Sequence, residues 1–167
     1  GTLPHHALAI TAANEHFTAI LPEWLLAHPE VFGNSEPRLQ TMWLWHSAEE
    51  AEHKSTAFDV YQAIGGNHSW RITWFRRVTL IFVTDVLRQT VNNLHHDGTL
   101  WQWRTWKSAA HTLFGREGLV RKTVRPWRDY LRRDFHPSQQ ESDQSSQWLR
   151  THSDVFTPVG ASAKAPA

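Results

Sequence analysis

The sequence contains no cysteine among its 167 residues. This absence excludes disulfides, thiolate nucleophiles and thiolate metal sites, so a bound metal ion would have to be held by His, Asp or Glu. The formal net charge is only +1, which argues against a strongly basic nucleic-acid-binding protein. The sequence also lacks a Gly-rich phosphate-binding loop and a recognisable secretory signal peptide.

Long apolar runs and strand patterns are also missing, which leaves helices as the dominant element. The most apolar stretch, VTLIFV, is too short to span a bilayer. The length suits one domain with a sizeable core. The pattern predicts an all-α bundle of four to five helices at residues 3–28, 37–64, 69–95, 100–114 and 119–134. We expect residues 1–137 to form a helical metal-binding domain. Residues 138–167 should form a polar linker, a short helix and a disordered C-terminal tail.

The predicted helix 37–64 carries an unusual polar patch within the segment WHSAEEAEHKSTAFDVY. Apolar residues at helical steps of three and four continue on both sides of it, so this stripe is expected to face the core. Carboxylates buried without partners cost several kcal/mol or more, and a divalent cation would satisfy them. Glu50-x-x-His53 also has the spacing that places two ligands one turn apart. A solvated helix face with i,i+4 pairs remains the alternative. The patch consists of His46, Glu49, Glu50 and His53.

The predicted helix 3–28 offers a third ligand, Glu15. It is the only charge on its helix face, and small residues beside it would let another helix approach. His16 lies at the edge of that face, as a further ligand or an ordinary buried histidine, and Glu15 could instead pair with a basic residue. One Glu helix and one Glu-x-x-His helix make half of a ferritin-like dinuclear site. We therefore expect a homodimer or a missing N-terminal segment to complete it.

Two segments, TAANEHFTAILPEWLLAHPE and WLWHSAEEAEHKSTAFDVYQAIGG, resemble the predicted metal-dependent hydrolases, a bacterial ferritin-like family. The resemblance covers residues 7–137. It implies that Glu15, Glu50 and His53 are metal ligands and that His46 and Glu49 bind the metal or support its ligands. Members of the family usually carry an N-terminal portion with another Glu helix and another Glu-x-x-His-like helix, and this sequence starts after it.

These residues predict a metal-dependent hydrolase that uses one or two divalent cations to activate water. Iron is the preferred metal, with zinc or manganese as alternatives, and Glu49 or His46 would act as the general base. Two other functions stay open: a ferritin-like di-iron oxidase or oxygenase with the same ligands, and a truncated helical domain without catalytic activity. The substrate is expected to be a small molecule whose class the sequence does not identify.

Tryptophans alternate with basic residues in WRITWFRR and LWQWRTWK. Packing of these tryptophans in a helical core is the favoured interpretation, and peripheral contact with a membrane surface is the alternative. The absence of cysteine makes the reducing cytoplasm the default expectation for the location, with membrane association as an additional option.

Overall fold

The computed structural model describes residues 3–140 and 143–154, and throughout this part of the chain the fold is all-α, as predicted. Two short 3-10 helices follow α1 and α6. The α-helices are α1 (Leu3–Ala27), α2 (Pro37–His53), α3 (Thr56–Ala63), α4 (His68–His96), α5 (Trp103–Phe114), α6 (Leu119–Asp129) and α7 (Asp143–Thr151).

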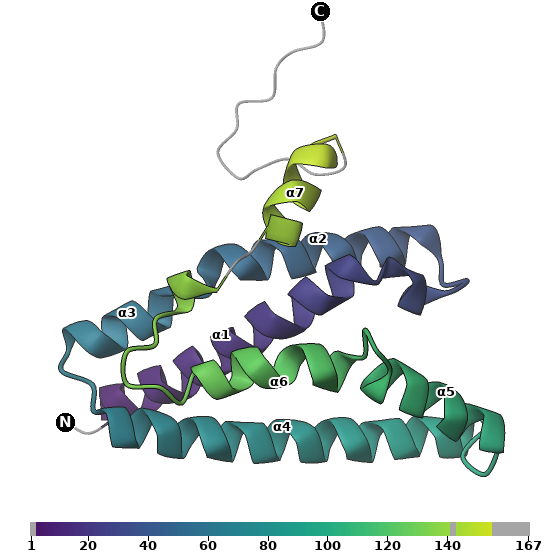
Figure 1. The fold of residues 1–167 in the computed structure, drawn as a ribbon, viewed down its shortest axis with the longest axis horizontal. Coiled ribbons are helices and arrows are strands. Elements are labelled where there is room, and N and C mark those ends of the chain that lie inside the picture. The colour runs from purple at the N-terminus through teal and green to yellow at the C-terminus, as the bar shows by residue number, and fades with distance from the viewer. Residues whose placement is uncertain (1–2, 141–142, 155–167) are drawn as a thin grey trace, which may run out of the picture.

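Helix α1 occupies the centre of the molecule, with α2 and α3 along one side and α4 along the other (Figure 1). Helix α6 packs against α1 and α5, and α7 packs against α1 and α2. Alanines on α1, including Ala9, Ala12 and Ala13, are fully or almost fully buried. Because these side chains are small, the neighbouring helices can approach α1 closely. Pro22 lies inside α1 without ending it.

The main core lies between α1, α3, α4 and the segment that follows α6. Aromatic side chains dominate it, and Phe75 of α4 is in contact with rings from α1, from α6 and from Tyr130 directly after α6. A smaller cluster joins Leu26 of α1, Ala48 of α2 and Trp148 of α7. The predicted short helix within residues 138–167 appears as α7, which packs against α2. The predicted disordered tail, residues 157–167, lies outside the described residues.

The predicted helix 37–64 is broken in the structure. Helix α2 ends at His53, a two-residue turn of Lys54 and Ser55 follows, and α3 begins at Thr56. The predicted stop at the two glycines is confirmed, because Gly65 takes the positive φ of 79° that favours glycine at a helix end.

The expected burial of the stripe along residues 39–64 is wrong for most of its described residues. The apolar ends of the stripe are exposed at Leu39, Met42, Val60 and Ile64. Helix α2 instead buries Ser47 and Ala48, whose small side chains let α1 and α7 pack closely. The apolar stripe is present on α2, but it lies on the exposed side of the helix, whereas the prediction placed it against the core.

Candidate functional site

Glu15 lies where α1 meets the break between α2 and α3. Its carboxylate Oε2 accepts a hydrogen bond from the backbone N–H of Ala57 at 3.0 Å. In a continuous helix that N–H would bond the carbonyl of residue 53, four positions earlier. The Ser55 side chain makes no capping hydrogen bond to α3, so Glu15 supplies a cap from a different helix. Its negative charge also suits the positive end of the helix dipole.

The predicted ligand Glu50 lies on α2, about two turns before the Glu15–Ala57 contact. Its side chain is 29% exposed, and its carboxylate lies 3.6 Å from Nε2 of His46, whose side chain is 50% exposed. Glu50 follows the buried Ala48 by two positions, which is about 200° around the helix. Glu50 and His46 therefore lie on the outward side of α2, away from α1. The partly exposed Glu49 lies between these two faces.

Residue His53 ends α2, directly before the turn that Glu15 approaches. Its backbone is described, whereas its side chain lies outside the described part of the structure. Among the side chains that are described, no three His, Asp or Glu residues gather closely enough to hold a metal ion. The donor types themselves, two carboxylates and an imidazole, suit iron, zinc or manganese. The set of Glu15, Glu50 and His53 thus remains a prediction.

His16, next to Glu15 on α1, is almost completely buried. Its Nε2 donates to the carbonyl of Pro126 at 3.1 Å, and its ring packs against Phe75, Tyr130 and Phe135. Burial lowers the pKa of His16 from 6.5 to about 4, because the imidazolium would lose its hydration. The nearby Arg71 charge lowers it further, and the hydrogen bond to Pro126 opposes the shift. His16 is therefore neutral near pH 7 and joins α1 to α6.

Arg71 of α4 forms the other polar part of this core and is 1% exposed. Its Nη2 donates to the carbonyls of Tyr130 and Arg132 at 3.2 and 2.6 Å. The guanidinium also lies 4.9 Å from the ring centroid of Phe58 and 5.0 Å from that of Tyr130. Burial lowers the pKa of Arg71 and raises that of Tyr130. Through these hydrogen bonds, Arg71 links α4 to the segment that follows α6.

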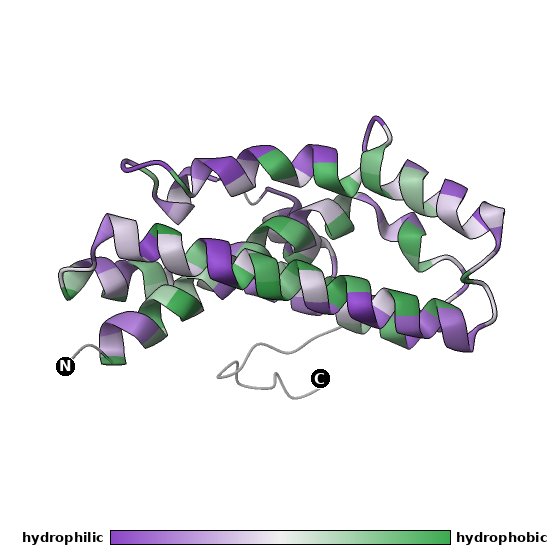
Figure 2. Cartoon of the chain, turned by 90° about the horizontal axis from the view of Figure 1, so that it is seen from below, coloured by the Kyte–Doolittle hydropathy of each residue, from purple (hydrophilic) through white to green (hydrophobic). Residues whose placement is uncertain are grey.

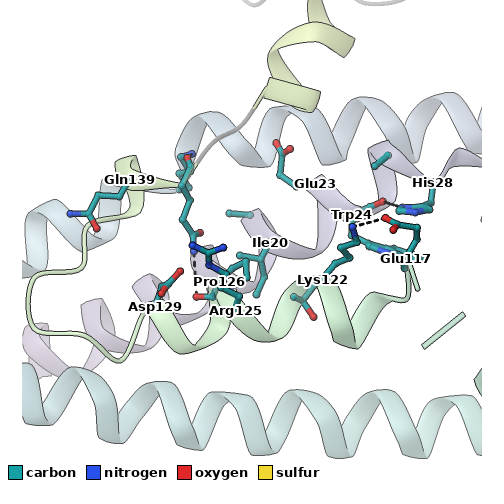
Figure 3. Close-up of a pocket in the computed structure, with 15 residues that line it drawn as sticks. Ile20, Glu23, Trp24, His28, Glu117, Lys122, Arg125, Pro126, Asp129 and Gln139 are labelled. Carbon is teal, nitrogen blue, oxygen red and sulfur yellow. Dashed lines mark hydrogen bonds and ion pairs between the residues drawn. The ribbon is translucent and has the colours of Figure 1, made fainter. Parts of the chain in front are cut away.

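A pocket of about 550 Å³ opens between α1 and α6 (Figure 3). Lys54, which directly follows His53, lines one side, and Glu23 of α1 and Asp129 of α6 line others. Nζ of Lys54 donates to the carbonyl of Gln140. Partial burial lowers the pKa of Lys54, and the charge of Glu23 opposes the shift. The pocket therefore combines acidic and basic groups beside the last turn of α2.

The patterns used for the sequence-based prediction did not select the pocket residues. Glu23 is a single charge within an apolar stretch, and Arg125 and Asp129 belong to a strongly basic segment. Only the packing of α6 against α1 brings these groups together. The Glu23 signal, a charge in an apolar helix, could have been recognised. The other residues carry no comparable local pattern.

The described part of the chain is an all-α helical bundle, an architecture that many metal enzymes share. The sequence model of one family, described as predicted metal-dependent hydrolase, matches residues 2–141. The chain therefore belongs to this family, and the suspected resemblance is confirmed. No curated protein and no solved structure matches the chain.

Proposed function

We propose that the chain is a hydrolase domain that binds a divalent metal ion through Glu15 and His53 at the break after α2, together with Glu50, which faces away from α1 in the structure and would have to turn toward the break. The observation that supports this proposal most is the contact of the Glu15 carboxylate with the turn directly after the Glu50-x-x-His53 segment. Family membership gives independent support. When bound, a divalent cation supplies Lewis-acid activation of water and of a carbonyl or phosphoryl group.

The remaining polar residues have distinct roles in this proposal. Glu49 or His46 would take the proton from the attacking water, since both are adjacent to the proposed ligands on α2 and are accessible to solvent. The pocket beside Lys54 opens on the α1 side of α2, away from the side that carries Glu50 and His46. Lys54 and Arg125 would attract an anionic part of the substrate there, remote from the reacting bond.

We further propose that the outward side of α2 is covered in the active assembly. Glu50 and His46 lie on that side, beside the exposed apolar residues Leu39 and Met42. A second copy of the chain or a further segment placed there would reduce the exposure of the apolar residues and add ligands to the half-site. This completion would bring the proposed site closer to a dinuclear ferritin-like centre.

The experiment is hydrolysis by protein that has been stripped with a chelator and reloaded with manganese, zinc or ferrous iron. Chromogenic esters, amides and phosphoesters would serve as substrates. We expect metal-dependent turnover that falls in Glu49→Gln or His46→Gln without loss of bound metal. Oxygen consumption by the iron-loaded protein without hydrolysis would instead support the di-iron oxidase alternative and overturn the proposal.

A further inference from the structure

The second half of α4 and the whole of α5 contribute no buried residue. On α4 the buried side chains are Arg71, Ile72, Phe75 and Val78. From Thr79 to Phe114, a range that the structure describes completely, every residue is exposed or only partly buried. Phe82 packs against Phe17 of the core, but most other apolar side chains of this segment are left uncovered.

Helix α4 has a second apolar face on the side opposite the core. Leu80, Leu87 and Val91 are spaced by seven and four residues, so they share one helix face. All three are exposed, Leu80 at 68%. The buried Phe75 and Val78 lie on the opposite face. Figure 2, which views the chain from the α4 side, shows apolar bands recurring along this helix.

Two strongly exposed tryptophans follow the end of α4 along the chain. Trp101 is 90% exposed in the connection to α5, and Trp103 at the start of α5 is 77% exposed. The favoured expectation that these tryptophans pack in the core is therefore wrong. We define the α4–α5 face as Leu80, Leu87, Val91, Trp101 and Trp103.

The charge of this half of the chain is strongly positive. Residues 68–134 contain 13 Lys and Arg against 5 Asp and Glu, a net charge of +8. Residues 1–67 contain 2 Lys and Arg against 8 Asp and Glu, a net charge of −6. Arg76, Arg77 and Arg88 lie beside the apolar stripe of α4 on the helix surface and are exposed. The almost neutral total charge conceals this separation.

We propose that the α4–α5 face binds the surface of a membrane that contains anionic lipids. Exposed tryptophans are suited to the headgroup region, where the ring contacts apolar chains and the indole N–H meets water or phosphate. Arginines beside the stripe can keep their charges at the phosphates while their stems cover apolar surface. None of the described helices is long and apolar enough to cross a bilayer, so the contact is peripheral.

The test is co-sedimentation of the full chain with vesicles of equal parts phosphatidylcholine and phosphatidylglycerol, compared with pure phosphatidylcholine. We expect preferential binding to the anionic vesicles. Raising the salt from about 0.1 M to about 1 M should weaken binding, because the Debye length falls from about 10 Å to about 3 Å. The double variant Trp101→Ala/Trp103→Ala should bind at least about tenfold more weakly, since it removes two large apolar side chains from the contact.

A second variant, Leu80→Ser/Leu87→Ser, tests the α4 stripe in the same way. The matched control is Val31→Ser/Val60→Ser, which changes two exposed apolar residues in the acidic half and should bind like the unaltered chain. Circular dichroism verifies that each variant keeps its helices. Absence of preferential binding, or equal weakening in the control, would overturn the proposal. A dimer that the tryptophan substitutions dissociate, without vesicle binding, would also overturn it and assign the face to a second copy.

Discussion

Replacing Glu15 separates a structural role of this residue from metal binding. In the metal-free protein, Glu15→Ala removes the acceptor for the Ala57 N–H at the start of α3. A hydrogen bond from a neutral donor to a charged group contributes about 1.5–3 kcal/mol, and loss of a helix cap costs about 1 kcal/mol. Because these two estimates describe the same contact, we expect the free energy of unfolding to fall by about 2 kcal/mol.

Urea unfolding in the presence of a chelator measures this change. With a slope of about 2 kcal/mol per molar urea, the midpoint should fall by about 1 M. Glu36→Ala is the matched control, because Glu36 occupies the N-cap of α2 without a capping side-chain hydrogen bond. Its effect should stay within about 0.5 kcal/mol. Equal midpoints for Glu15→Ala and Glu36→Ala would refute the capping role.

The conservative variant Glu15→Gln distinguishes the two roles. Glutamine keeps an oxygen acceptor for Ala57 but lacks the negative charge, so we expect a loss of about 1 kcal/mol or less in stability. A metal site would be more sensitive to this change, because divalent cations favour a carboxylate over a neutral amide. Unchanged metal affinity in Glu15→Gln would leave Glu15 as a helix cap and exclude it as a ligand.

Two further predictions concern the buried polar core. Arg71→Met should lower the free energy of unfolding by about 3 kcal/mol, because the carbonyls of Tyr130 and Arg132 lose their donor. Urea unfolding should show no such loss for Arg76→Met on the exposed side of α4. Equal losses in the two variants would contradict the stabilising role of Arg71. Because the pKa of His16 falls from 6.5 in the unfolded chain to about 4 in the folded one, the unfolded state binds more protons between these values and stability decreases as pH falls. From about pH 7 to about pH 5 the free energy of unfolding should decrease by about 2 kcal/mol. In His16→Gln this pH-dependent decrease should disappear. The same decrease in the unaltered chain and in His16→Gln would show that another group is responsible.

Local patterns were sufficient for most helix boundaries. The periodic segment 69–95 appears as α4 with one residue added at each end, because its ends carry strong stop signals. The break at Lys54 and Ser55 was not predictable in this way. It coincides with a carboxylate from α1 that satisfies the backbone at the start of α3, and no local pattern reports such a partner.

The side of α2 that becomes buried could not be read from its apolar pattern. Leu39 and Met42 are larger and more apolar than Ser47, yet Ser47 is buried and they are exposed. Helices α1 and α7 pack closely against α2, and the side of α2 with small side chains is the one that allows this close approach. An apolar stripe shows that a surface favours burial, but it does not say whether the same chain provides the cover.

Metal content per chain, measured together with molecular mass in solution, tests the central claim most directly. We predict that the unaltered chain and Glu36→Ala retain a divalent metal after equilibrium dialysis, whereas Glu50→Ala and His53→Ala lose it. A dimer holding one metal per chain would support completion of the half-site by a second copy. Equal and negligible metal in all four proteins would contradict the metal site, and a monomer with two tightly bound metals would contradict the half-site.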